Sequence, residues 1–284
     1  MNRFLAGMMI FGISAMAWAD EQPVAEEAPQ AVAADVEVVE NVAVEGEAEA
    51  VVVDEEVEIE SVVHQFSPIV LTTHYGTKVT GLVIGNALEG RSILVLHDRW
   101  GINEQVKALM TRLADAGYFV LTIDLFDGRV SEREDIAELI MMQVDPVWNS
   151  ANVKAGVDYL HSRHASVAVL GLGYGGEQAF AASLSQSDKV DVAVVYYAPL
   201  KFEPSITNVS VPVLALLPGV DAGINFTQAE EFKKIASLSN PRVEVDVINI
   251  EAKHGFADPQ YPSYDAKAAD EAIAEVERFL AANL

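Results

Sequence analysis

Cysteine is absent from this chain of 284 residues. Its absence excludes a disulfide framework and the lipid-modified cysteine that anchors bacterial lipoproteins. The chain would survive an oxidising compartment without using it for stability. Basic residues are also few, because 18 Lys and Arg stand against 43 Asp and Glu, which gives a formal net charge of −25 at pH 7.

The first 19 residues predict a signal peptide. Arg3 provides a positive start, residues 4–18 are uncharged, and Ala17-Trp18-Ala19 places small residues where a signal peptidase cleaves. An uncleaved anchor is the alternative, since the uncharged stretch approaches the length of the shortest spanning helices. No basic cluster follows it. We therefore expect cleavage before Asp20 and an exported protein, periplasmic or secreted, with no membrane partner after cleavage.

Residues 20–61 lack basic and aromatic side chains and hold fifteen of the acidic residues. Self-repulsion of such a like-charge run opposes collapse, so we predict a disordered acidic linker. Two roles are open for it. It is either a soluble spacer or a tether for a basic protein partner of unknown identity.

Residues 62–284 are long enough for one domain with a substantial core. Their 28 acidic against 17 basic residues argue against nucleic acid or an anionic membrane surface as a partner. Short β-branched runs alternate with helical periods, which indicates an α/β fold. We expect a leading hairpin (62–84), then strands at 92–96, 118–123, 167–170, 192–196, 213–217 and 242–248, with helices between them and at the end. This order predicts a mostly parallel, doubly wound sheet flanked by helices.

Polar residues follow several of these strands. In open α/β sheets, sites form beyond the carboxyl ends of the strands. The residues there are His97-Asp98-Arg99, Asp124, the glycine cluster 171–176, Asp221 and His254. A glycine-rich strand-to-helix turn, then an acid, then a histidine is the chain order of α/β-hydrolases.

The chain resembles the dienelactone hydrolase family at five motifs in order. These are His97-Asp98-Arg99-Trp100-Gly101, Asp124-Leu125-Phe126-Asp127-Gly128-Arg129, Gly171-Leu172-Gly173-Tyr174-Gly175-Gly176, Gly219-Val220-Asp221 and His254-Gly255-Phe256. The resemblance covers nearly all of residues 66–284. It implies an α/β-hydrolase fold and hydrolysis of small esters or lactones, without a cofactor or metal.

The resemblance also assigns site residues. It implies His254 as the catalytic base and Asp221 as its acid. Tyr174 and Asp98-Arg99 would supply oxyanion-hole N–H groups, Trp100 would be pocket wall or core, and Arg129 would bind substrate.

The sequence departs from the family at three positions. The family's cysteine nucleophile falls on Gly173, which has no side chain. Its glutamate after the first histidine is the shorter Asp98, and its carboxylate-binding arginine is replaced by Asp258. Losing a nucleophile costs on the order of 10⁶-fold in rate. Two hypotheses are therefore open: a modified hydrolase, or an inactive homologue that binds a small ester, lactone or carboxylate-like ligand, or a protein, in the periplasm.

Other patterns in the domain favour other chemistry less strongly. Tyr174 is a poor substitute nucleophile, because a phenol has a pKa of about 10. Ser183 and Ser185 lie too far along the following helix. The Gly171, Gly173 and Gly176 spacing also fits a dinucleotide fingerprint, but no acid ends the next strand.

The remaining histidines favour structural roles. His161 and His164 could share a metal, but no third ligand is evident, and the end of a helix explains them. His97 is expected to shape its turn, and Asp124 is either a site residue or a loop cap.

Overall fold

The computed structural model describes residues 65–200, 209–221 and 226–284. The predicted signal peptide and acidic linker lie outside the described residues. Eight strands form one sheet in the order β1-β2-β4-β3-β5-β6-β7-β8. They are β1 (Ser67–Thr72), β2 (Lys78–Ile84), β3 (Arg91–Leu96), β4 (Phe119–Ile123), β5 (Ser166–Leu172), β6 (Val192–Tyr196), β7 (Val213–Val220) and β8 (Val245–Lys253).

The sheet is mostly parallel. Only the hairpin β1–β2 and the pairing of β2 with β4 are antiparallel, and all pairings from β4 through β3 to β8 are parallel. Every residue of β4 and β6 is buried. Helices on both faces of the sheet explain why these two strands are almost wholly apolar, with Thr122 of β4 as the exception. The α/β-hydrolase architecture expected from the sequence is confirmed.

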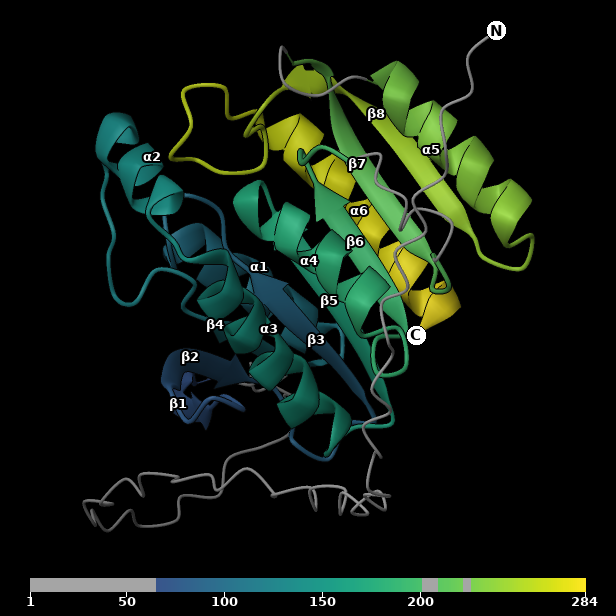
Figure 1. Ribbon diagram of the computed structural model, residues 1–284. Coiled ribbons are helices and arrows are strands. Elements are labelled where there is room, and N and C mark those ends of the chain that lie inside the picture. Colours follow the sequence, from purple (N-terminus) through teal and green to yellow (C-terminus); the bar gives the residue numbers. More distant parts are fainter. Residues whose placement is uncertain (1–64, 201–208, 222–225) are drawn as a thin grey trace, which may run out of the picture. The chain divides into compact units, whose positions relative to one another are not determined.

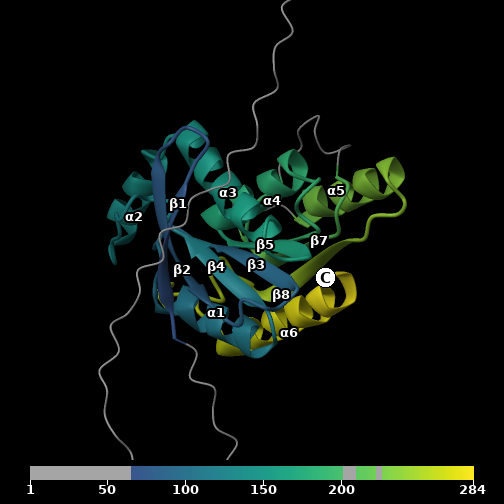
Figure 2. The ribbon, with the colours of Figure 1, turned by 90° about the horizontal axis from the view of Figure 1, so that it is seen from below.

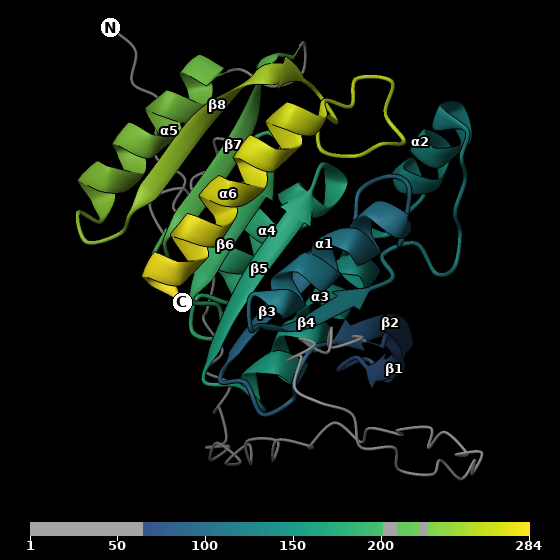
Figure 3. The ribbon, with the colours of Figure 1, turned by 180° about the vertical axis from the view of Figure 1, so that it is seen from behind.

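Helices cover both faces of the sheet (Figures 1 and 2). The helices α3, α4 and α5 lie on one face, while α1 and α6 lie on the other, as the view from behind shows (Figure 3). The helices are α1 (Glu104–Asp115), α2 (Glu134–Met142), α3 (Pro146–His161), α4 (Tyr174–Ser185), α5 (Phe226–Ser239) and α6 (Ala266–Asn283).

Short side chains fix where several helices begin. The Asn103 side chain accepts the N–H of Val106 at the start of α1, and Asp145 caps α3 just before Pro146. Gly117 follows α1 with φ +85°, as expected of the glycine that ends a helix. The last strand differs from expectation. It begins at Val245, because residues 240–243 form a turn closed by the Val243 N–H on the Asn240 carbonyl.

Candidate active site

The turn between β5 and α4 places Gly173 at the carboxyl edge of the sheet. Its backbone has φ +49° and ψ −112°, a region that residues with a Cβ rarely adopt. The Gly173 N–H donates to the carbonyl of Tyr196, at the end of the neighbouring β6, over 3.0 Å. A strained strand-to-helix turn of this kind is the backbone of a nucleophile elbow.

The Asp98 carboxylate, just beyond the end of β3, lies directly against Gly173. A Cβ built on Gly173 would stand 2.2 Å from Oδ1 and 2.6 Å from Oδ2 of this carboxylate. Oδ1 accepts the backbone N–H of Tyr174 (3.0 Å), and Oδ2 accepts the Tyr261 hydroxyl (2.5 Å). Asp98 is 3% exposed. The carboxylate therefore fills the space in which a side chain at position 173 would begin.

Tyr261 comes from the loop between β8 and α6, and sequence reasoning missed it. Its ring packs on Gly255, where an added Cβ would lie 2.2–2.5 Å from ring atoms. Burial, together with the negative charge of Asp98, raises the pKa of the Tyr261 hydroxyl. The phenol therefore stays protonated at neutral pH and donates to Asp98. No local pattern indicates this contact, because the two residues are 163 positions apart.

The structure brings His254 and Asp221 together from the ends of β8 and β7. His254 Nδ1 and Asp221 Oδ2 are 2.7 Å apart. The His254 side chain is 33% exposed, whereas that of Asp221 is 8% exposed. Within the part of the chain that the structure describes, His254 Nε2 has no hydrogen-bond partner. A carboxylate that holds Nδ1–H leaves Nε2 as the basic nitrogen, which is the arrangement of a general base.

Tyr197 connects this pair to the Asp98 side of the site. Its ring centroid lies 5.2 Å from that of His254 and 6.4 Å from that of Tyr261. Tyr197 is fully buried, and its φ of +35° is unusual for a residue with a side chain. Its hydroxyl has no hydrogen-bond partner among residues 65–200, 209–221 and 226–284. A strained backbone and a buried unpaired hydroxyl are typical of functional sites.

His97 and Asp124 hold the backbone around the site. The fully buried His97 donates Nδ1–H to the carbonyl of Asp98 (2.8 Å) and accepts the Leu125 N–H at Nε2 (2.9 Å). Both ring nitrogens are thereby used. The Asp124 carboxylate accepts the N–H groups of Phe126 and Gly128. His97 thus shapes the turn as the sequence indicates, and Asp124 caps its own loop.

Arg99 and Trp100 lie on the outer side of Tyr261. The Arg99 guanidinium stands 5.5 Å from the Tyr261 ring centroid and pairs with Glu134 at 3.3 Å. Trp100 meets the same ring edge-on at 5.4 Å and forms a small buried cluster with it and Ala137. Trp100 is therefore a buried residue that packs on Tyr261, and its Nε1 has no hydrogen-bond partner in the described ranges.

Arg129 and the Tyr174 side chain have their contacts elsewhere. Arg129 Nε donates to the Phe126 carbonyl (2.9 Å), and its Nη1 reaches Gln143 at 3.5 Å. Within the described residues, Arg129 forms no hydrogen bond or ion pair with Asp98 or His254, so the structure does not bring it to them. The Tyr174 hydroxyl accepts an N–H from Asn149, and burial raises its pKa to about 12. A phenol that is so hard to ionise is a poor nucleophile at neutral pH.

The histidine pair and the glycine pattern, which the sequence offered as possible metal and dinucleotide sites, have structural roles. His164 Nδ1 lies 2.7 Å from the Glu89 carbonyl, and its ring stacks on Phe119. Within the described ranges, no three His, Asp or Glu residues are grouped as a metal site. Of the fingerprint glycines, Gly171 lies against the backbone of α4, Gly173 against the Asp98 carboxylate and Gly176 against the Ala198 side chain. None of the described helices is long and apolar enough to cross a bilayer.

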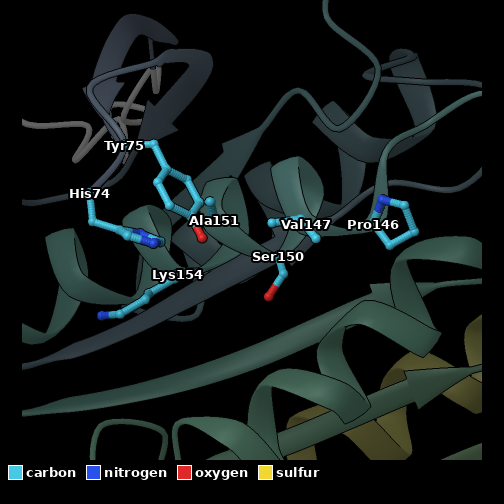
Figure 4. Close-up of a pocket in the computed structure, with 7 residues that line it drawn as sticks. All are labelled: His74, Tyr75, Pro146, Val147, Ser150, Ala151 and Lys154. Carbon is cyan, nitrogen blue, oxygen red and sulfur yellow. The ribbon is translucent and has the colours of Figure 1, made fainter.

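An open pocket of about 400 Å³ lies away from these residues, between the β1–β2 turn and α3 (Figure 4). His74 and Tyr75 of the turn reach over the helix, and Lys154 lies at the end of the pocket opposite Pro146. Its walls contain none of the residues that the sequence assigned to the site. The pocket is therefore lined by neither His254 nor Asp98.

The buried Asp258 carboxyl predicts a pH-dependent effect on stability. Burial raises the pKa of its carboxyl, although Asn103 and the Gln260 N–H donate to it. A carboxyl group whose pKa is higher in the folded state stabilises the fold when it is protonated. This stabilisation is complete below the unfolded-state pKa of about 3.9, and it is lost as the pH rises through the folded-state pKa. Asp258→Asn should therefore raise the melting temperature at pH 7 by a few degrees, and the gain should vanish near pH 3.

Thermal melts of wild type and Asp258→Asn from pH 3 to 8 measure this effect. The exposed Asp188→Asn is the matched control and should show no such trend. An Asp258→Asn protein that is less stable than wild type at pH 7 would mean that the carboxylate's hydrogen bonds outweigh its desolvation.

Comparisons with known proteins agree with this fold. The model of the "Dienelactone hydrolase family" matches residues 80–284. A "Putative carboxymethylenebutenolidase" of Aquifex aeolicus is 24% identical over 210 residues, which cover 69% of this chain and 90% of that protein. The solved structure "m3DLH" has a TM-score of 0.67 at 19% identity and covers 78% of this chain and 99% of its own.

An esterase of Pyrococcus furiosus, Pf2001, is similar in structure with a TM-score of 0.59 at 18% identity, covering 78% of this chain and 93% of its own. At such identities the structural likeness concerns the fold. The family match, however, extends over most of the chain, from β2 to the last helix. This chain therefore belongs to the dienelactone hydrolase family.

Proposed function

We propose that this protein is a hydrolase of small esters or lactones that lacks a side-chain nucleophile at Gly173 and activates water with His254 and Asp221. The observation that supports it is the 2.7 Å pairing of these two residues, with His254 Nε2 left as the basic nitrogen. Gly173, with its positive φ between β5 and α4, is proposed to stand at the family's nucleophile position.

The expected activity is modest, because water replaces a covalent nucleophile. A hydrolase without its nucleophile retains roughly 10³–10⁴-fold acceleration over water. We expect the full chain to hydrolyse 4-nitrophenyl acetate at about this level, and His254→Ala to lower kcat/KM at least about a hundredfold, the lower end of the range for base catalysis. The exposed His161→Ala is the matched control and should keep the wild-type rate.

A second function, ligand binding without turnover, is favoured by one observation. The Tyr174 N–H, which would stabilise an oxyanion, is already bound by Asp98. Under this hypothesis, esters and lactones would raise the melting temperature in proportion to ln(1 + [L]/Kd) without forming product. Thermal shifts without product, and equal rates for wild type and His254→Ala, would contradict hydrolysis and support binding.

We also propose export to the periplasm or the medium, on the basis of residues 1–19 alone. The mature protein should begin at Asp20. Intact-mass measurement of the exported protein tests this, and retention of residues 1–19 in the membrane fraction would contradict it.

A further inference from the structure

The Asp98 carboxylate occupies the place of the missing nucleophile and is itself a nucleophile. We infer that Asp98 gives this site a second activity, the hydrolytic displacement of halide from small alkyl halides through an ester formed on its carboxylate. The inference rests on the proposed role of His254 and Asp221 in activating water. Asp98 is the attacking group.

Position is the first support for this role. Both Asp98 oxygens lie within 2.6 Å of where a Cβ at residue 173 would stand, at the carboxyl edge of the sheet. The Tyr174 N–H and the Tyr261 hydroxyl fix the carboxylate in one orientation. Tyr261 also lies next to His254, with ring centroids 5.6 Å apart. The carboxylate and the base therefore share a neighbour on one side of the site.

The chemistry of carboxylates selects saturated carbon over acyl carbon. When a carboxylate attacks an alkyl ester, the tetrahedral intermediate expels the better leaving group. The better leaving group is the weaker base. Here it is the carboxylate, whose acid has a pKa of about 4. An alkoxide is a poorer leaving group, because its basicity approaches that of hydroxide, and water has a pKa of 15.7. Attack on a saturated carbon that bears a halide has no such return path. The product is a stable ester on Asp98.

The leaving group must depart without taking a proton. Burial raises the pKa of Tyr197 and of Tyr261, which makes both phenols poor acids. They remain good hydrogen-bond donors. The Tyr197 hydroxyl and Trp100 Nε1 are buried and have no acceptor among the residues described here, and both rings flank Tyr261. Neutral O–H and N–H donors of this kind suit a departing halide ion.

The two steps balance. In the first, an Asp98 oxygen forms a bond to the substrate carbon as the carbon–halogen bond breaks, and halide leaves with the electron pair. In the second, His254 Nε2 takes a proton from water, and the hydroxide attacks the Asp98 carboxyl carbon. The ester C–O bond breaks, the alcohol leaves with a proton from His254, and one proton is released to solvent. The sum is alkyl halide and water giving alcohol, halide ion and a proton.

The test traps the ester. The full-length His254→Ala protein is incubated with 1-bromobutane and measured by intact mass and peptide mapping. We expect stoichiometric gain of one butyl group on the peptide containing Asp98, and release of one bromide per chain. In the His254→Ala protein, the added substitution Asp98→Asn should abolish both the adduct and the bromide release. The added substitution Asp188→Asn, which removes an exposed carboxylate, should leave both unchanged.

Isotope labelling tests the same step in the wild-type protein, without any substitution. A single turnover in water labelled with heavy oxygen should place the label in the Asp98 carboxylate, because water attacks the carboxyl carbon. Label found only in butanol would mean direct displacement by water and would overturn the inference.

The outcomes separate the two proposals. His254-dependent hydrolysis of 4-nitrophenyl acetate without a butyl adduct would leave the proposed function standing and overturn the role of Asp98. A butyl adduct on Asp98 without ester hydrolysis would support the nucleophile and contradict ester turnover. Absence of adduct, label and bromide release in folded protein would overturn the inference outright.

Discussion

Gly173→Cys combined with Asp98→Ala is expected to create a thiol esterase. The thiol would supply the missing attacking atom, with His254 and Asp221 as its base and orienting acid. Removing the Asp98 carboxylate also frees the Tyr174 N–H for an oxyanion. We expect kcat/KM for 4-nitrophenyl acetate to rise at least about a hundredfold, a small part of the roughly 10⁶-fold effect of a nucleophile.

Residues 173 and 98 must change together because the Asp98 carboxylate lies where the new side chain would begin. A Cβ at residue 173 would stand 2.2–2.6 Å from the Asp98 carboxylate, so Gly173→Cys alone must displace a group held by two hydrogen bonds. It also places a Cβ at φ +49°, which costs about 1–3 kcal/mol. We expect the single variant to be less stable and less active than the double variant.

The matched control is Gly173→Ala with Asp98→Ala, which has the same Cβ and the same missing carboxylate but no thiol. The measurement is the pre-steady-state burst of 4-nitrophenolate, together with the mass of the acetylated protein. Equal rates for folded thiol and alanine variants would show that residue 173 does not stand at a working elbow.

Gly171→Ala is expected to have the largest effect on stability. A Cβ on Gly171 would lie 2.0 Å from the Gly175 carbonyl oxygen and 2.5 Å from the Gly176 nitrogen. These are backbone atoms of α4, so the helix would have to move away from β5. Overpacking of a core costs about 1–3 kcal/mol and occasionally more. We expect at least about 3 kcal/mol, because no flexible side chain can yield.

Chemical denaturation measures this loss. Gly90→Ala is the control, since its Cβ would meet only the Ala165 Cβ at an ordinary 3.8 Å and should change the free energy of unfolding little. A Gly171→Ala protein as stable as the control would show that α4 does not need this close approach. The glycine cluster would then need another explanation.

The fold was largely predictable from the sequence because its signals are local. The buried strand β6 is an uninterrupted apolar run, and Asn103, Asp145 and Gly117 mark helix ends by hydrogen bonds to nearby backbone. The order of motifs along the chain also placed His254 and Asp221 at the ends of parallel strands. Strand ends of one sheet meet at one edge, so their proximity follows from topology alone.

Only the tertiary structure decided which group lies against Gly173. The sequence alone determined that position 173 has no side chain, that cysteine is absent, and that residue 98 is an aspartate. It could not place the Asp98 carboxylate in the space above Gly173 or the Tyr261 hydroxyl against it. These contacts join residues 75 and 163 positions apart, and no periodicity or turn signal reports on such a distance. Within the β8–α6 loop, the Tyr261 ring packs on Gly255. This packing fixes the ring, and its hydroxyl orients the Asp98 carboxylate.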